Sequence, residues 1–243
     1  MTSSLRDKLA TYQPAPIATQ LIKKTSILLL VGPTGAGKDA LKERLLKTGE
    51  YRHIVSHTTR SPRMNHGTIE RNGVDYHFID LATAEKMLQE KAFIEAKTYS
   101  DNFYGTSVME IQAAHDKGKI AMADIEVQGV AEYKTLDPGV IAVFLLPPDF
   151  KTWQKRLQNR YGDVVDVEDY TRRLQTALEE LEQLLNTNYY VAVINKDLET
   201  AFHDVQAIVR AQGKQTPDDS AAREVARRLA QDIQKYLDHV ATA

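Results

Sequence analysis

With 243 residues, of which 42% are hydrophobic and 26% charged, the chain has the composition of a soluble globular protein, either one α/β domain with insertions or two small domains. Its formal net charge of −2 excludes the global basic field that attracts nucleic acid or an anionic membrane. The chain has no cysteine, which excludes disulfides and thiolate metal sites. Residues 1–8 lack the apolar core typical of a secretory signal, and no apolar run approaches the length of a membrane span. We therefore expect a cytoplasmic protein without a membrane partner.

The N-terminal extension, residues 1–25, predicts two short helices, at about 5–12 and 17–23, with a break at Pro14 and Pro16 between them. None of its side chains carries an evident chemistry. We interpret the extension as a packing or self-association element, and a mobile arm is the alternative.

A glycine-rich loop follows the apolar run 27–31 and leads into the helical segment 40–46. The loop consists of Gly32, Pro33, Thr34, Gly35, Ala36, Gly37, Lys38 and Asp39. Strand, glycine turn and helix in this order are the context of a phosphate-binding loop, in which backbone N–H groups and the helix N-terminus cradle the phosphate. Lys38 adds a mobile cation for phosphate oxygens. The structural alternative is a turn that uses glycine only for sharp bending.

Asp39 occupies the position where such a loop normally carries a Ser or Thr that ligates Mg²⁺. A carboxylate oxygen is a hard ligand and can bind the same ion, so we assign Asp39 as the metal ligand. The opposite interpretation is that its charge repels a triphosphate and impairs catalysis.

The segment 56–63 combines hydroxyl groups with Arg60 and Arg63, a composition suited to binding an anion through directed, charge-assisted bonds. A solvated polar loop is the alternative. Asn72-Gly73 follows, with aromatic residues at 76 and 78, and this pattern predicts a β-hairpin.

Further elements follow from apolar periodicity and turn residues. The sequence predicts a helix over 83–90, a short strand over 93–95, and a turn over 102–107 that opens a helix over 107–117 through a hydroxyl N-cap. Strands are predicted at 119–124, 140–146 and 189–195, and helices at 127–134, 167–188 and 198–210. Asp124 ends a buried strand where open α/β sheets bind their ligands, although it could instead cap the following helix.

These segments together resemble the guanylate kinase family of P-loop nucleoside monophosphate kinases. The resemblance extends from about Ser26 to about Arg210. Its motifs occur in the same order as in the family: the glycine loop, 56–63, 72–78, 93–95, 103–106 and 124–129. The resemblance implies an α/β fold, namely a P-loop kinase core with a parallel sheet flanked by helices. It also implies a guanylate kinase-like domain over 26–211, with a GMP-binding insertion at about 56–112 and a lid at about 148–170.

The resemblance also implies the acceptor site. It assigns Ser56, Arg60, Arg63 and Tyr76 to the phosphate of the monophosphate, Tyr104 beside it, and Glu95, Thr106 and Glu126 to the guanine. A carboxylate can accept from the guanine N1–H and the exocyclic amine together. Glu126 stands where the family usually has Asp. Glu70 matches a family acid, but four inserted residues, such as 64–67, place it farther from Arg63 in the sequence than in the family. Asp124 is implied at the substrate site, in the magnesium sphere through water.

For catalysis the resemblance implies Lys38 together with the lid arginines Arg156, Arg160 and Arg173, while Arg172 is interpreted as a surface residue. Arginines on a lid can neutralise the charge that develops on a transferring phosphoryl group. Asn195 is placed near the adenine pocket. The implied cofactors are ATP and Mg²⁺, and the implied acceptor is GMP, with dGMP as an alternative.

Two other functions compete with this one: a guanylate kinase-like binding module that has lost catalysis, and a P-loop kinase for another phosphorylated acceptor. Nucleic acid is disfavoured as a partner because the chain lacks a basic stripe. In the C-terminal segment, 212–243, apolar residues at 225, 229, 233 and 237 predict a helix that packs on the core or on a second copy. We expect a monomer or a homodimer.

Overall fold

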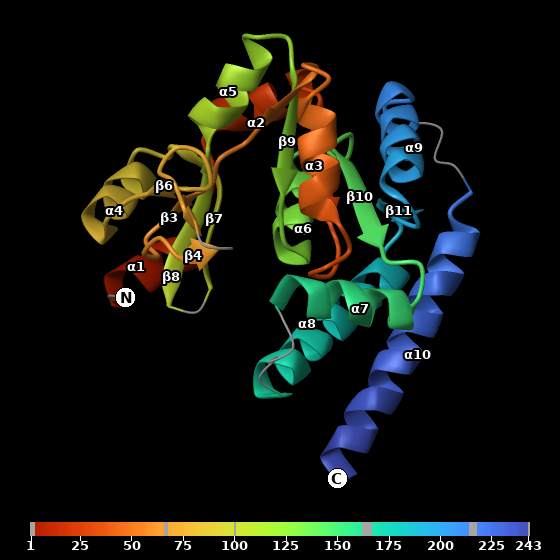
Figure 1. Ribbon diagram of the computed structural model, residues 1–243. Coiled ribbons are helices and arrows are strands. Elements are labelled where there is room, and N and C mark those ends of the chain that lie inside the picture. Colours follow the sequence, from red (N-terminus) through yellow and green to blue (C-terminus); the bar gives the residue numbers. More distant parts are fainter. Residues whose placement is uncertain (1–2, 66–67, 100, 162–166, 214–217, 243) are drawn as a thin grey trace. The chain divides into compact units, whose positions relative to one another are not determined.

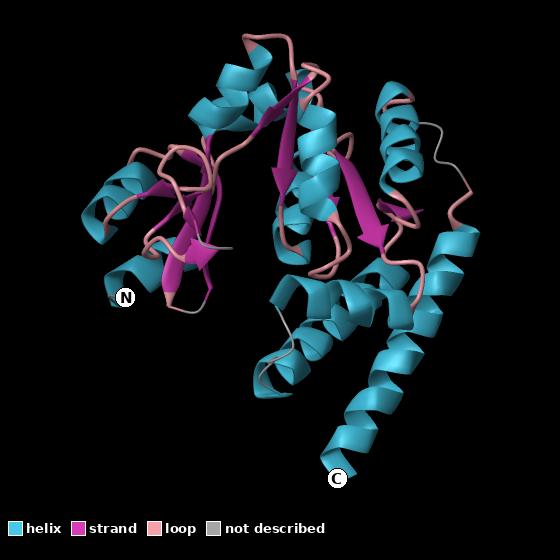
Figure 2. Cartoon of the chain, viewed as in Figure 1, coloured by secondary structure: helices cyan, strands magenta, loops and turns pink. Residues whose placement is uncertain are grey.

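A computed structural model of the chain describes residues 3–65, 68–99, 101–161, 167–213 and 218–242. Parallel strands and helices alternate along most of its length, which makes it an α/β protein (Figures 1 and 2). The chain divides into two compact units. The first unit consists of Met1–Ile27, Glu50–Ala123 and Ala131–Pro138, and the second consists of Leu28–Gly49, Asp124–Val130 and Gly139–Ala243.

The second unit is built on three parallel strands in the order β11-β10-β1. Their bounds are Ile27–Val31 for β1, Ile141–Leu146 for β10 and Tyr190–Ile194 for β11. All residues of β1 and β10 are buried, as expected for continuous apolar runs in a sheet that is covered on both faces. The predicted strands are confirmed here.

Five helices complete the second unit. They are α3 (Lys38–Leu46), α7 (Phe150–Tyr161), α8 (Val167–Asn186), α9 (Leu198–Arg210) and α10 (Ser220–Thr242). Asp197 begins α9, since its carboxylate accepts the Thr200 N–H at 2.9 Å and thereby caps the helix. The glycine loop lies between β1 and α3, as predicted.

The C-terminal helix α10 packs on its own chain. Its buried residues Ala222, Ala226, Leu229 and Ile233 recur at helical spacing, and it contacts α7, α8, β10 and β11. Two side chains near its N-terminal end also reach the outer strand β11. Asp219 accepts the Ala192 N–H at 3.1 Å, and Arg223 donates to the Tyr190 carbonyl at 3.1 Å. The sequence did not show whether this helix packs on the core or on a second copy of the chain. In the structure it packs on the core of the second unit.

The first unit contains the parallel pair β2 (Tyr51–His53) and β9 (Ile120–Asp124) and a sheet in the order β6-β3-β8-β7. The bounds in this sheet are His57–Thr58 for β3, His77–Phe78 for β6, Phe93–Tyr99 for β7 and Asn102–Ser107 for β8. Helices α4 (Leu81–Gln89) and α5 (Val108–His115) accompany it. Helix α6 (Val127–Leu136) contributes to both units.

Two local predictions in this region were wrong. Residues 102–107 form strand β8 rather than a turn, because they pair antiparallel with β7 along its length. Asn72-Gly73 does not open a β-hairpin, since β6 pairs parallel with β3 and the Asn72 side chain instead accepts the Phe78 N–H at 2.9 Å. In both places long-range pairing overrides the local turn signal. Ser107 does precede α5, but its hydroxyl makes no capping bond.

The N-terminal helices α1 (Ser3–Ala10) and α2 (Pro16–Lys24) belong to the first unit. Leu5 is fully buried in a cluster with Phe93 and Phe103, and the Tyr12 hydroxyl donates to the Phe93 carbonyl at 2.7 Å. The extension therefore packs, as the first of its two interpretations held. No helix in the described part of the chain has the length and hydropathy required to cross a bilayer.

Candidate functional site

The glycine loop of the second unit can be built only with glycine at its tightest points. Gly32 and Gly37 have φ angles of 131° and 99°. A Cβ on Gly32 would lie 2.2 Å from the Leu145 carbonyl oxygen, and a Cβ on Gly37 would lie 2.2 Å from Nδ2 of Asn195. Helix α3 begins directly after Gly37, so its free N–H groups face the loop. These features are the physical requirements of a phosphate cradle.

Lys38 and Asp39 open helix α3. The Lys38 ammonium donates to the carbonyls of Gly32 and Pro33 and so is held against the loop. The Asp39 side chain is 55% exposed and lies 3.5 Å from Nζ of Lys42. Its carboxylate is thus accessible at the first turn of the helix.

Side chains from elsewhere in the second unit hold the loop through hydrogen bonds. Trp153 Nε1 on α7 donates to the Thr34 carbonyl at 2.7 Å, and Asn195 Nδ2 donates to the Ala36 carbonyl at 2.7 Å. Arg156 Nη2 in turn donates to the Asn195 carbonyl at 2.9 Å. Asn195 was predicted near an adenine pocket, and its side chain is engaged with the loop backbone.

The lid arginines differ in their surroundings. Arg156 keeps its Nη1 atom shielded from solvent and, among the described residues, without a hydrogen-bond partner, and burial lowers its pKa. Arg173 forms an ion pair with Asp169 at 2.6 Å, and the exposed Arg172 also contacts Asp169. The side chain of Arg160 lies outside the described residues. The bond to the Asn195 carbonyl holds the Arg156 guanidinium next to the residue that contacts the glycine loop.

A series of contacts between aromatic rings links the C-terminal helix to the glycine loop. The Tyr236 ring on α10 lies 5.6 Å from Tyr170 and 6.1 Å from Phe150, and Phe150 lies 6.0 Å from Trp153, which holds Thr34. The sequence did not indicate this support, because it depends on how the helices pack.

Carboxylates also gather near Lys38 in the second unit. Asp124 and Glu126, both predicted, are exposed, and the Ile125 N–H between them donates to the Leu30 carbonyl of β1 at 3.1 Å. The half-buried Glu180 on α8 was not predicted. Burial raises the pKa of Glu180 to about 7, while Lys38 lowers it and the charges of Glu126 and Asp124 raise it. Among the described residues, no group of three or more His, Cys, Asp or Glu side chains is arranged to hold a metal ion alone.

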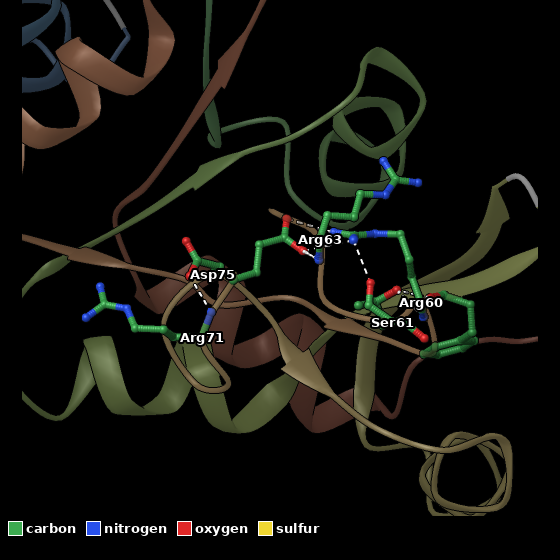
Figure 3. A network of polar contacts seen from close by, with 8 residues as sticks. Arg60, Ser61, Arg63, Arg71 and Asp75 are labelled. Carbon is green, nitrogen blue, oxygen red and sulfur yellow. Dashed lines mark hydrogen bonds and ion pairs between the residues drawn. The ribbon is translucent and has the colours of Figure 1, made fainter. Parts of the chain in front are cut away.

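In the first unit, Arg60 and Glu70 form a buried two-point ion pair, with both N···O distances at 2.9 Å. Arg60 also donates to the Ser61 carbonyl at 2.8 Å (Figure 3). Burial opposes the Arg60 cation, but the bonds with Glu70 outweigh it and raise the pKa of Arg60. Burial likewise opposes the Glu70 anion, and bonds from Arg60 and from the Arg63 backbone lower its pKa. Arg60 is thus fixed as a cation.

The position of Glu70 follows from the inserted residues. Strands β4 (Met64–Asn65) and β5 (Thr68–Ile69) pair as a small antiparallel hairpin, and the Glu70 N–H donates to the Arg63 carbonyl beside it at 2.9 Å. The Arg63 N–H donates to the Glu70 carboxylate at 2.8 Å. The insertion is accommodated in the hairpin, so Glu70 stays at the arginines despite its shift in sequence.

Two tyrosines lie next to Arg60. Its guanidinium carbon is 5.2 Å from the centre of the Tyr76 ring, a cation–π geometry, and the Tyr76 and Tyr104 rings are 6.1 Å apart. Tyr104 also hydrogen-bonds to Arg60. The structure therefore brings together Arg60, Glu70, Tyr76 and Tyr104, while the Arg63 side chain is exposed beside them.

A buried carboxylate lies in the same unit. Glu95 is 5% exposed, and the Thr106 hydroxyl donates to its Oε1 at 2.8 Å. Ser56 Oγ lies 3.4 Å from the Thr106 oxygen, so the three side chains adjoin. Glu126, predicted to act with them, belongs to the second unit, where its field acts on Glu180.

The chain is similar to known proteins over most of its length. The model of the family described as guanylate kinase matches residues 24–212. A guanylate kinase of Syntrophotalea carbinolica is 35% identical over 194 residues, which are 79% of this chain and 89% of that protein. A guanylate kinase of Schizosaccharomyces pombe is 34% identical over 211 residues, which are 86% and 96%. The crystal structure of guanylate kinase from Anaplasma phagocytophilum matches with a TM-score of 0.58 and 25% identity, and covers 79% of this chain and 88% of that one.

Proposed function

Because this chain belongs to the guanylate kinase family, we propose that it transfers the γ-phosphoryl group of ATP to GMP and releases ADP and GDP. The proposal needs a donor site, an acceptor site and a source of charge neutralisation, since phosphoryl transfer depends on positioning and electrostatics more than on covalent groups. Each need corresponds to described residues of one of the two units.

The glycine loop and Lys38 are the proposed donor site. Backbone N–H groups at the start of α3 would bind the phosphates of ATP, and the Lys38 ammonium, which now contacts loop carbonyls, lies close enough to turn to them. Arg156 supports the same assignment, because its shielded Nη1 atom can meet the charge of a phosphoryl oxygen. Arg160 and Arg173 remain proposed members of this catalytic set.

Asp39 fits Mg²⁺, the ion that the family implies. Its exposed carboxylate at the first turn of α3 offers hard oxygen ligands, which this ion prefers. The bound ion would neutralise phosphate charge, and Asp124 is the carboxylate that we propose to bind one of its water molecules.

The Arg60 cluster is the proposed site for the acceptor phosphate. Glu70 holds the Arg60 guanidinium in place while Tyr76 and Tyr104 flank it, and Arg63 and Ser56 extend the set. A pre-oriented guanidinium with hydroxyl groups beside it binds a phosphate dianion through directed bonds.

One observation carries the choice of GMP. Glu95 is buried and is held by Thr106 in the same unit as the Arg60 cluster. A carboxylate there can accept from the N1–H and the amino group of guanine together, and adenine has no such pair of donors. A binding module for phosphorylated protein, or a kinase for an acceptor without a base, has no use for this group.

A coupled assay with ATP and Mg²⁺ tests the proposal by offering GMP, dGMP, AMP, CMP and UMP in parallel. We expect turnover with GMP, and with dGMP if the ribose hydroxyl is not read, with little turnover of the other three. Turnover of none of the five nucleotides would refute the proposed kinase activity and favour the binding module. Arg60→Ala should then lower GMP affinity by roughly 2–4 kcal/mol and spare ATP, and equal losses for both nucleotides would refute the assignment of Arg60.

A further inference from the structure

Two residues of the proposed phosphate site directly precede a pair of very short strands. Ser56 precedes β3 and Tyr76 precedes β6, and the two strands pair in parallel over two residues each. The His77 N–H donates to the Ser56 carbonyl at 2.8 Å, so Ser56 and Tyr76 lie at the same end of the pair. So short a ladder supplies few backbone bonds to hold these two positions.

The Glu110 carboxylate contacts both chain segments at this end of the pair. Glu110 lies in the first turn of α5, and its side chain is 12% exposed. Its Oε1 atom lies 3.0 Å from Nε2 of His77, and its Oε2 atom accepts the Val55 N–H at 3.3 Å. The two oxygens thus connect the residue that follows Tyr76 with the residue that precedes Ser56.

Two further side chains restrict this carboxylate and its imidazole partner. Nη2 of Arg52 on β2 lies 3.5 Å from Oε2 of Glu110, which places a cation beside the largely buried anion. The His57 ring on β3 lies 4.5 Å from the His77 ring. Glu110 is therefore the centre of a polar cluster to which β2, β3, β6 and α5 all contribute.

We propose that Glu110 is a positioning residue of the acceptor site, whose carboxylate holds the segments that carry Ser56 and Tyr76 at the spacing a phosphate requires. The inference rests on the proposed function and extends it to a residue that acts only through chain neighbours of the site. The Tyr76 ring centre lies 5.2 Å from the Arg60 guanidinium carbon. A shift of β6 would therefore disturb the surroundings of Arg60 as well, and small misplacements weaken directed bonds strongly.

A control variant must separate positioning from stability. An acid in the first turn of a helix is favoured by the helix N-terminus, so Glu110→Ala should destabilise α5 in any case. Asp80→Ala is the matched control, because the Asp80 carboxylate caps α4 in the same unit and accepts the Thr83 N–H at 2.7 Å. It should lower Tm and leave GMP binding unchanged.

The test measures the Kd for GMP and for ATP by calorimetric titration, together with kcat and Tm. We expect Glu110→Ala to raise the Kd for GMP about tenfold, as for one displaced hydrogen bond to a charged phosphate, and to keep the Kd for ATP within about twofold. A lower Tm with an unchanged Kd for GMP, as in Asp80→Ala, would overturn the proposal. So would equal losses for GMP and ATP.

A double-mutant cycle tests whether Glu110 acts through Tyr76. Tyr76→Phe removes a hydroxyl of the proposed phosphate site and should raise the Kd for GMP in the wild-type background. In the Glu110→Ala background this hydroxyl is already displaced, so the combined rise should be at least about threefold smaller than the product of the single rises. A combined rise equal to that product would show independent effects and contradict the positioning role.

Glu110→Gln covers the case in which the Ala variant does not fold. The single amide oxygen can accept from the Val55 N–H or from the His77 imidazole but not from both, so the Kd for GMP should rise about threefold. An unchanged Kd in this variant would also overturn the proposal.

The two levels of inference fail separately. A wild-type protein that neither binds nor phosphorylates GMP refutes the proposed function and this inference with it. A GMP kinase whose Kd for GMP is unaffected by Glu110→Ala refutes only the role of Glu110.

Discussion

Arg60 and Glu70 meet through two N···O contacts of 2.9 Å, although an inserted hairpin lies between them in the chain. Glu70→Gln removes the charge and one acceptor, leaving a buried guanidinium partly unpaired. We expect GMP affinity to fall at least tenfold and the first unit to be destabilised by about 3 kcal/mol or more, with ATP affinity unchanged. Calorimetric titration of both nucleotides and urea unfolding measure these effects.

The control for Glu70 is another two-point pair. Arg44 and Glu199 in the second unit also meet at 2.9 and 3.1 Å, but on the surface, where water screens the charges. Glu199→Gln should change neither stability nor GMP affinity appreciably. Similar effects in the two variants would show that burial of the Arg60 pair is irrelevant.

Trp153 offers a direct signal of donor binding, because it is the only tryptophan of the chain and its indole N–H binds the Thr34 carbonyl of the glycine loop. ATP should therefore change the tryptophan emission strongly. Trp153→Phe should raise the Kd for ATP by about 3- to 10-fold, as for one lost neutral hydrogen bond, and leave GMP unaffected.

Trp153→Phe requires a control for general loosening of α7. Gln158 is exposed on the same helix, and Gln158→Ala should leave ATP affinity unchanged while retaining the tryptophan signal. An ATP titration that leaves the emission of the wild-type protein constant would speak against a loop held by Trp153.

Asp39 should make ATP binding depend steeply on magnesium. Two unit charges at ~5 Å and an effective dielectric near 20 repel by about 3 kcal/mol, and a divalent ion between them reverses the sign. Asp39→Ser should thus bind metal-free ATP more tightly than the wild type and gain less from Mg²⁺. Titrations with and without Mg²⁺ measure this, with the exposed Glu43→Gln on the same helix as control. Equal affinity of both proteins for metal-free ATP would refute the charge argument.

Glu180 makes a pH-dependent contribution to stability. Burial is the main cause that raises its pKa to about 7. The folded state thus binds a proton that the unfolded chain releases near pH 4.5, so this contribution is complete below pH 4.5 and is lost as pH rises through 7. Glu180→Gln should reduce the fall in unfolding free energy between pH 5 and pH 8 by about 1–2 kcal/mol.

Urea unfolding at the two pH values measures the effect of Glu180→Gln. Its neighbour Glu179, exposed on the same helix, supplies the control variant Glu179→Gln. A pH dependence that is identical in the wild type and in Glu180→Gln would show that another group titrates.

The core strands and the glycine loop were predictable because their signals are local. The run 27–31 is apolar throughout, as is typical of a short buried strand, and the glycine spacing after it is that of a phosphate-binding loop. Strand β8 was missed for the converse reason. It contains Asn102 and Gly105, which are turn residues in isolation, and a Cβ on Gly105 would lie 3.0 Å from the Glu95 carbonyl across the pair. Only the pairing with β7 explains that glycine.

The sequence identified the residues of the proposed GMP site, but it did not show which of them contact one another. Arg60 and Glu95 stand in recognisable motifs, but the bond between Arg60 and Glu70 depends on how the inserted hairpin closes. The bond from the Thr106 hydroxyl to Glu95 likewise depends on the register of β7 and β8, which places these two residues opposite each other.

The contact between α10 and β11 bears on solubility as well as on packing. An outer strand presents unpaired backbone groups that can template pairing with another molecule, and β11 is apolar along its length. The Asp219 carboxylate accepts the outward N–H of Ala192, and Arg223 donates to the outward carbonyl of Tyr190. The segment beyond residue 212, where the family match ends, therefore covers an edge that would otherwise be open to pairing with another molecule. We expect a chain shortened at that point to lose colloidal stability while its Arg60 cluster, which lies in the first unit, remains intact.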